Sequence, residues 1–441
     1  MTSSAFDSLL FAKLFPTGDT SQLFSDSSQV RAMLLVEAAL AKAQAEAGII
    51  PETSAAAIQR ASHEVQIDPA ALAPSVGQNG VSVPGLVAAF RKEMNAPEHA
   101  QFVHWGATSQ DIIDTSLMLR LRQALALAER DVKDLLEILA QQAEIHAETE
   151  MCARTYGQAA TPTTWGAVLA QWGQPLVDSL IRLPALRDAC LWVSLSGAAG
   201  TASALGDDPA HVRSLVARNL GLIDPCRTWH TDRGPILRIS DWLWDVASPL
   251  GSMAETALAL SASGVEELTF SSGGSSSTMP QKSNPVTASA LRALTFCLPH
   301  HAATLRSGSV QQHQRDGVAW FTEWLVLPQI VLGTSSALQL GIELARSMSP
   351  NVARMKAGIE DGLGLIFAEA LSFALCKTMS RPSAQTAAKA LCAQAVSENT
   401  SLQKLAYAAH PELDADVFTT RAQFGLATTD AKQFSKRVRD L

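Results

Sequence analysis

The stretch TSQDIIDTSLMLRLRQALALAERDVKDLLEILAQQAEIHAE, residues 108–148, decides the fold. It contains neither proline nor glycine, and its apolar residues recur every three or four positions, as at Leu117, Leu121, Ala124 and Ala128. This spacing predicts one helix of roughly 40 residues, about 60 Å long. Because helices in globular proteins usually end within about 20 residues, this one needs packing partners along its whole length.

Four more long helices are predicted over residues 162–192, 240–267, 287–307 and 323–347. Several helices of comparable length indicate an all-α, elongated bundle that oligomerisation extends. Shorter helices, interrupted by proline and glycine, fill the two ends of the chain. Three domains are therefore expected: an N-terminal helical domain (1–105), a central long-helix domain (106–348) and a small C-terminal helical domain (349–441).

The composition narrows the class of protein. The 441 residues carry a net charge of −8, and the 17% of charged residues form no blocks. This excludes a nucleic-acid binder that works through bulk charge, so an anionic substrate must be held by a few local cations. The six cysteines lie far apart, no metal-ligand spacing or cofactor motif is present, and the N-terminus lacks the features of a signal peptide. We expect a soluble cytoplasmic protein with no membrane contact, metal or cofactor.

Three polar segments interrupt the helical pattern. The first, His104 to Asp111, could be a simple capped helix start, but its polar side chains at a positive helix terminus could also hold a carboxylate. The second, Arg154 to Pro162, is predicted to be a polar turn with its proline near the first position of the next helix. The third, Ser196 to Thr201, lacks the order of a phosphate loop and is predicted to be a tight turn between helices.

A fourth segment, SSGGSSSTMPQKSNP over residues 271–285, differs in kind. A run of serine and glycine alone would indicate a flexible linker. Here two prolines flank Lys282 and Asn284 and restrict the backbone around a cation and an amide. A hydroxyl-rich loop joined to such a cationic platform suits a lid that closes over an anion.

These segments together resemble the fumarase/aspartase superfamily. Residues 276–285 resemble its signature G-S-S-x-M-P-x-K-x-N-P, with Ser275 where the pattern has glycine. Residues 104–115 and 154–162 resemble the first and second regions of the family, and residues 197–201 are also typical. The matches come in family order and span most of the chain. They imply a three-domain, almost all-helical subunit in a homotetramer with a twenty-helix bundle, whose active sites each draw on three subunits.

Within the superfamily, residues 104–111, 229–231 and 312–315 resemble the cycloisomerases, which lactonise a carboxymuconate in the β-ketoadipate pathway of aromatic degradation. Tyr156 stands where the lyases place a histidine after Arg-Thr. In a lactonisation the attacking group is a substrate carboxylate, which is already ionised at neutral pH, so loss of the histidine is tolerable. The alternatives are another lyase, such as adenylosuccinate or argininosuccinate lyase, and a non-catalytic structural protein, since this scaffold also serves as a lens crystallin.

The resemblance also implies roles in the signature loop. Ser276 is the expected proton donor, and its neighbour Ser277 remains open for the same role. Lys282 is expected to pair with a carboxylate of the substrate, a small anionic tricarboxylate, and Asn284 to donate an amide N–H to it. A serine hydroxyl is a poor acid–base group unless nearby cations stabilise its alkoxide, which makes the lysine important.

The remaining candidates are expected to bind the substrate. Thr108, Ser109 and Gln158 are carried over from the family as carboxylate-binding donors. Arg315, beside His313, would supply a third cation, with an ion pair between subunits as the equal alternative. His104 is either a binding residue or structural, and Tyr156 is expected to line the pocket.

Overall fold

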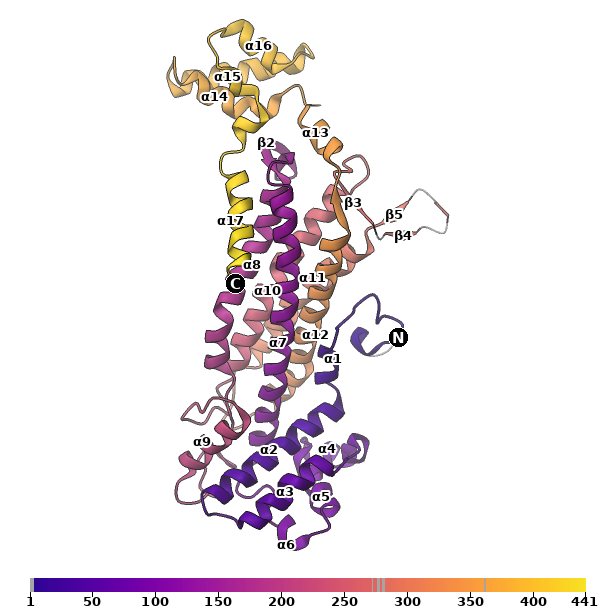
Figure 1. The fold of residues 1–441 in the computed structure, drawn as a ribbon, viewed down its shortest axis with the longest axis vertical. Helices are drawn as coiled ribbons and strands as arrows, with labels where there is room; N and C mark the ends of the chain where they lie inside the picture. The colour runs from indigo at the N-terminus through magenta and orange to yellow at the C-terminus, as the bar shows by residue number, and fades with distance from the viewer. Residues whose placement is uncertain (1–3, 272, 276–277, 280–281, 361) are drawn as a thin grey trace. The chain divides into compact units, whose positions relative to one another are not determined.

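The computed structural model describes residues 4–441 except 272, 276–277, 280–281 and 361. Helices dominate the chain (Figure 1), and the predicted all-α class is confirmed. The contacts divide the chain into two compact units. The first contains residues 1–131, 179–247 and 293–339, and the second contains residues 132–178, 248–292 and 340–441. The three predicted domains remain a prediction.

The long predicted helices are present. They are α7 (Ser109–Ile145), α8 (Trp165–Cys190), α10 (Gly234–Leu260), α11 (Val286–Ser307) and α12 (Gly317–Ser347). The apolar stripe that predicted α7 is buried, with Leu117 at 5% and Leu121 at 1% exposure. Each of these helices contributes residues to both units.

The first unit also holds the shorter helices of the N-terminal part of the chain and one later helix. Their bounds are α1 (Thr20–Leu23), α2 (Asp26–Glu46), α3 (Glu52–Glu64), α4 (Ala73–Asn79), α5 (Val83–Glu93), α6 (Pro97–Ala100) and α9 (Pro209–Leu220). The Ser25 hydroxyl caps α2 by accepting a hydrogen bond from the Ser28 N–H. Helix α2 packs against both α3 and α9, and Met33, Leu40 and Ile58 are fully buried in this unit.

Among its described residues, the second unit contains three short two-stranded antiparallel sheets. They are β1 (Glu150–Thr155) with β2 (Gln158–Thr164), β3 (Leu268–Phe270) with β6 (Met348–Pro350), and β4 (Gly274–Ser275) with β5 (Ser283–Asn284). The first corrects the predicted turn before α8. Pro162 lies in β2 opposite Cys152, and α8 begins only at Trp165. The Thr164 hydroxyl accepts a hydrogen bond from the Ala167 N–H and caps that helix instead.

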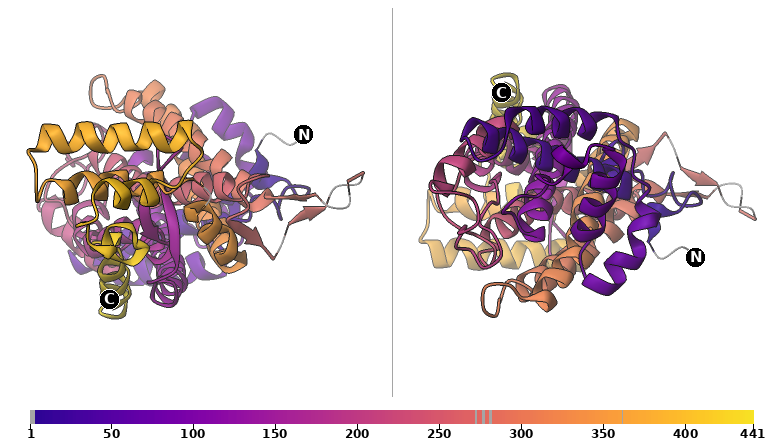
Figure 2. Two further views of the ribbon diagram at one scale, coloured as in Figure 1. Left: turned by 90° about the horizontal axis from the view of Figure 1, so that it is seen from above. Right: turned by 90° about the horizontal axis from the view of Figure 1, so that it is seen from below.

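The C-terminal part of the second unit is a group of small helices. Their bounds are α13 (Val352–Glu360), α14 (Ala368–Leu375), α15 (Arg381–Ser397), α16 (Leu402–Ala409) and α17 (Ala427–Arg439). Helices α14 and α15 lie side by side in Figures 1 and 2, and Leu371, Leu375 and Ala384 pack in a core between them.

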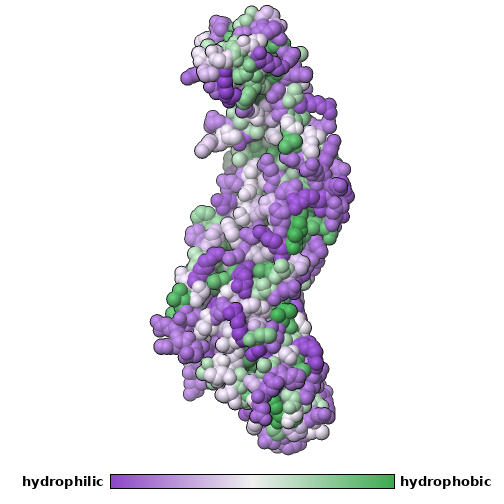
Figure 3. All heavy atoms as spheres, turned by 90° about the vertical axis from the view of Figure 1, so that its left-hand side faces the viewer, coloured by the Kyte–Doolittle hydropathy of each residue, from purple (hydrophilic) through white to green (hydrophobic). Residues whose placement is uncertain are grey.

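Among the described residues, α12 alone is long and apolar enough to cross a membrane. However, 78% of its most apolar window is buried inside the protein, as expected for a core helix. On the face shown in Figure 3, hydrophilic and hydrophobic residues are interspersed.

Candidate active site

A tight turn leads into α7 in the first unit. His104 and Gly106 have left-handed backbones, with φ of +63° and +74°. A Cβ atom on Gly106 would lie 2.3 Å from the carbonyl oxygen of Ala204, so only glycine fits there. The Gln44 side chain on α2 donates a hydrogen bond to the Trp105 carbonyl at 2.7 Å. This turn therefore has a fixed path that places Thr108 and Ser109 at the beginning of α7.

Asp111, in the first turn of α7, organises the segments around it. Its fully buried carboxylate accepts hydrogen bonds from the backbone N–H groups of Thr108 (3.1 Å), Ser196 (2.8 Å) and Gly197 (2.9 Å). The Ser194 hydroxyl and the His230 ring Nε2 also contact it, the latter at 2.8 Å. One carboxylate thereby holds the helix start, the loop after α8 and the segment before α10 in one place.

Arg315 brings a cation to the same region. Its guanidinium donates to the Thr108 hydroxyl (3.2 Å), the Gln110 side-chain oxygen (2.9 Å) and the Ala198 carbonyl (3.2 Å). All three acceptors are neutral, so these contacts orient the arginine without cancelling its charge. An exposed, oriented and uncompensated guanidinium is suited to bind a carboxylate.

Gln110 connects Arg315 to a buried ion cluster. The Gln110 amide donates to Asp114 at 3.2 Å, and Asp114 accepts two hydrogen bonds from Arg233, at 2.7 and 3.1 Å. Arg233 makes two more with Glu323, at 2.9 and 2.7 Å. Burial raises the pKa of Glu323, and Asp114 raises it further against the attraction of Arg233. These groups fix Gln110, and through it the position of Arg315.

His104 is paired with an acid from α2. Its Nδ1 lies 2.7 Å from Oε1 of Glu37, which is 1% exposed. Burial disfavours the charged ring, but the Glu37 charge and hydrogen bond outweigh it, and Asp111 adds to them, so the pKa of His104 is raised. Glu37 thus favours a positively charged ring beside the start of α7.

The second unit carries the hairpin candidates. Thr155 pairs with Gln158, so Tyr156 and Gly157 form a two-residue turn, with φ of +52° and +75°. Positive φ at both positions is typical of a type I′ hairpin turn. Tyr156 and Gln158 are exposed at the end of this hairpin. The substrate-lining role predicted for Tyr156 stays a prediction.

Arg154 anchors the same hairpin. It makes two hydrogen bonds to the buried carboxylate of Glu267, at 2.8 and 2.6 Å. Glu267 directly precedes β3, and the segment that follows leads into the signature loop. The ion pair therefore ties the hairpin to the stem of that loop.

In the signature loop, β4 and β5 place Ser275 opposite Ser283 and Gly274 opposite Asn284. Lys282 is exposed, and its backbone N–H donates to the Met279 carbonyl at 3.0 Å. Asn284 is half-buried. The predicted proton donors, Ser276 and Ser277, lie outside the described residues.

The predicted residues thus fall into two groups. The first unit holds His104, Thr108, Ser109 and Arg315, together with His313, which is exposed near Arg315. The second holds the rest, namely Tyr156, Gln158, Lys282 and Asn284. Within the first unit, the structure joins Thr108 directly to Arg315. No described hydrogen bond or ion pair joins the hairpin candidates to those of the signature loop.

Several residues that position the candidate site could not be identified from the sequence alone. Asp111 was visible as a first-turn acid, but its donors lie up to 119 positions away, and no local pattern indicates them. Arg233, Glu37 and Gln110 gave no signal of their own. For His230 the signal was the resemblance of residues 229–231, which did not reveal what the side chain does.

The chain is similar to known proteins along most of its length. The model of the lyase family matches residues 16–297 of the chain. The chain belongs to the fumarase/aspartase superfamily. Within the superfamily, the chain is 37% identical over 399 residues to the 3-carboxy-cis,cis-muconate cycloisomerase of Pseudomonas aeruginosa, covering 89% of this chain and 87% of that protein.

Other members of the superfamily are also similar. The nitrosuccinate lyase of Streptomyces davaonensis is 33% identical over 402 residues, covering 88% of this chain and 84% of that protein. The crystal structure of the 3-carboxy-cis,cis-muconate lactonizing enzyme from Pseudomonas putida matches with a TM-score of 0.91 and 33% identity, over 98% of this chain and 99% of that one.

Proposed function

We propose that this chain is a cycloisomerase, an intramolecular lyase that reversibly lactonises 3-carboxy-cis,cis-muconate in the cytoplasm. The observation that carries the proposal is Arg315, a cation held in place by three neutral acceptors beside Thr108. His104, whose pKa is raised by Glu37, adds a protonated ring at this helix start, whose charge Glu37 offsets. A tricarboxylate needs several such groups, because the chain as a whole is acidic.

The reaction is an intramolecular conjugate addition. An oxygen of one substrate carboxylate bonds to the alkene carbon β to a second carboxylate, and the alkene electron pair moves onto that second group. The resulting aci-carboxylate then accepts one proton at its α-carbon, which gives the lactone without loss of any other atom. Cations and N–H or O–H donors aimed at the second carboxylate stabilise the charge as it develops.

The roles follow from the chemistry of the residues. Arg315 and Lys282 hold carboxylates by charge, and His104 offers a ring N–H. Thr108 and Ser109 offer hydroxyl donors at the N-terminus of α7. Gln158 and Asn284 contribute amide N–H groups. Ser276 delivers the proton, with Ser277 as the alternative donor. Because the attacking carboxylate is ionised at neutral pH, the reaction needs no base at the position of Tyr156.

The test is an assay that follows loss of the conjugated-diene absorbance of 3-carboxy-cis,cis-muconate. We expect turnover, and we expect Ser276→Ala to lower kcat at least about 10²-fold with a smaller effect on KM. Ser271→Ala, in the same serine-rich run, is the matched control and should stay near the wild-type rate. A normal rate for Ser276→Ala together with a large loss for Ser277→Ala would move the proton-donor role to the neighbour.

A second candidate is a lyase that cleaves a substituted succinate, which the similarity to the nitrosuccinate lyase favours. Fumarate release from nitrosuccinate, adenylosuccinate or argininosuccinate, with no loss of the muconate diene, would establish it. Absence of turnover in every assay would leave a structural protein, whereas any turnover excludes one.

A further inference from the structure

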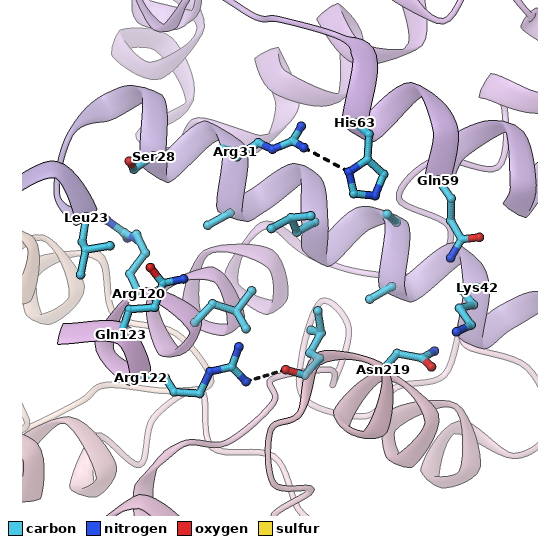
Figure 4. Close-up of a pocket in the computed structure, with 16 residues that line it drawn as sticks. Leu23, Ser28, Arg31, Lys42, Gln59, His63, Arg120, Arg122, Gln123 and Asn219 are labelled. Atoms are coloured by element: carbon cyan, nitrogen blue, oxygen red, sulfur yellow. Dashed lines mark hydrogen bonds between the residues drawn. The ribbon is translucent and has the colours of Figure 1, made fainter. Parts of the chain in front are cut away.

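A pocket of about 450 Å³ lies in the first unit between α2, α3, α7 and α9. Figure 4 shows polar side chains from these facing elements around it. None of the candidate active-site residues lines this pocket. Arg120 on α7 follows Thr108 by 12 positions, which is about 18 Å along a helix. We name this cavity the Arg120 pocket.

Arg120 itself is the unusual feature. It is only 8% exposed, its Nε atom has no hydrogen-bond partner among the described residues, and burial lowers its pKa to about 10. The guanidinium carbon lies 5.5 Å from the centroid of the Phe24 ring, in a cation–π contact. The other deeply buried arginine, Arg233, is held by two carboxylates. A buried guanidinium without an anion is costly, so its retention indicates a missing partner.

The other cations of the Arg120 pocket also have no acidic partner among the residues that the structure describes. Arg122 donates to the carbonyls of Leu220 and Gly221, at 2.7 and 2.8 Å. Arg31 donates to the Ser62 carbonyl and lies 3.2 Å from Nδ1 of His63. Backbone carbonyls orient these groups but leave their positive charge in place.

The rest of the lining supports a bound anion. Lys42 adds a fourth cation, and no aspartate or glutamate is among the described residues that line the pocket. The side-chain nitrogen of Asn219 is buried and has no hydrogen-bond partner within the described part of the chain, so it is available as a donor. In a chain with a net charge of −8, four cations around one pocket without an acid are not explained by composition.

Apolar side chains complete the wall, among them Leu23, Leu35, Leu119 and Leu220. A compact inorganic anion would leave these surfaces unused, whereas a flat hydrocarbon body would cover them. The volume is within the range of small-molecule sites. We propose that the Arg120 pocket is a second ligand site, separate from the active site, for an aromatic or unsaturated organic acid with at least two carboxylates.

The experiment is calorimetric titration of the full-length protein with isophthalate, an aromatic dicarboxylate. Isophthalamide serves as the uncharged analogue, and inorganic phosphate as the compact anion. Each titration is repeated in Arg315→Met, which weakens carboxylate binding at the candidate active site. We expect isophthalate to bind at one site per chain that persists in Arg315→Met. Phosphate should bind more weakly, and isophthalamide should not bind.

Arg120→Met tests the buried cation. It should weaken isophthalate binding at least about tenfold, because a desolvated carboxylate loses its partner. Arg182→Met removes the same charge from an exposed ion pair elsewhere in this unit and should bind normally. Without ligand, Arg120→Met should be at least as heat-stable as the wild type, because an unpaired buried charge has gone. If it does not fold, Lys42→Met at the exposed rim gives the same test.

Three results would overturn the proposal. One is isophthalate binding that Arg315→Met abolishes and Arg120→Met leaves unchanged, because the ligand then occupies only the active site. Another is the absence of any isophthalate binding. The third is a wild-type protein that binds no isophthalate together with an Arg120→Met variant that sediments differently from it. Arg120 would then stabilise a contact between subunits and not a bound ligand.

Discussion

At the scale of single residues, one side chain departs from the family pattern, and the structure shows what surrounds it. Tyr156 occupies a left-handed position in a two-residue turn, fully exposed in the described chain. Asparagine or glycine is usual at such a position, because the backbone strain is smaller for them. A tyrosine retained there despite the strain is consistent with a role in binding.

We expect the activity of Tyr156→Phe to be within about tenfold of the wild-type activity. A tenfold loss corresponds to about 1.4 kcal/mol, which is the contribution of one hydrogen bond. The phenol is a poor base at neutral pH, and the proposed reaction needs none here. Tyr156→Ala should instead raise KM, and Lys282→Met should be far worse than either. Steady-state kinetics measure all three. A fall of several orders of magnitude in kcat for Tyr156→Phe, with KM unchanged, would make the phenol a catalytic acid and remove the argument against a lyase.

The pair formed by His104 and Glu37 predicts how stability depends on pH. The folded state raises the pKa of His104, so it binds this proton more tightly than the unfolded chain does. The resulting stabilisation is fully present below the ordinary histidine pKa of about 6.5 and is lost as pH rises through the higher folded-state value. The free energy of unfolding lost in His104→Asn should therefore be larger near about pH 5.5 than near about pH 9.

Urea denaturation of both proteins across this range measures the difference. His211→Asn, at an exposed position, is the control and should show little pH dependence. If His104→Asn lowers the free energy of unfolding by the same amount at every pH, the pair of His104 and Glu37 contributes only packing and a neutral hydrogen bond.

At the scale of elements, the turn before α7 is fixed by close packing. Backbone strain at a positive φ costs about 1–3 kcal/mol for a residue other than glycine. Gly106→Ala should lower the free energy of unfolding by more than this, because the new methyl group would also clash with the Ala204 carbonyl. Gly157→Ala is a matched control, since Gly157 has a similar φ of +75° but no atom within 4 Å of an added Cβ. Equal shifts in the urea midpoint for the two variants would show that the packing at Gly106 is soft.

The elements also show what a sequence can and cannot predict. The long helices were predictable because a repeat of three and four residues is local, as at Leu117 and Leu121 in α7. The hairpin of β1 and β2 was not, because β2 consists mostly of alanine and threonine and contains Pro162. The partners of Arg233 lie 119 and 90 positions away, at Asp114 and Glu323, so no local pattern could indicate that cluster.

The motif residues of the candidate site were predictable, while their supports were not. Thr108 and Arg315 were both identified from motifs, but the hydrogen bond between them spans 207 positions. The role of Glu37 depends on the path of the turn at residues 104–106, which follows from tertiary packing. The motifs thus name the candidate residues, and only the fold shows which contacts orient them.

At the scale of the whole molecule, the long helices expose apolar side chains that a single chain does not cover. These are Ile145 at the end of α7, Ile181 on α8, Phe296 on α11 and Leu325 on α12, each at least 59% exposed. Burial of such residues in a bundle of several chains would stabilise an oligomer. We propose a homotetramer whose active sites combine residues from three subunits.

The protein should therefore sediment near four times 46.8 kDa. Replacing Leu325 and Phe296 with glutamate should dissociate it, because charged groups would enter the proposed interface. The same change at Leu10, an exposed position outside the long helices, is the control. A monomer that retains full activity would contradict both the tetramer and the shared site.

The position of the Asp111 partners has a consequence for synthesis of the protein on the ribosome. His230 follows Asp111 by 119 positions, which at about 5–20 residues per second is a delay of roughly 6–24 s. During that time the Asp111 carboxylate lacks the His230 contact, and for the first 85 positions it also lacks the N–H groups of Ser196 and Gly197. A nascent chain, or a fragment that ends before residue 230, therefore cannot complete the contacts of Asp111.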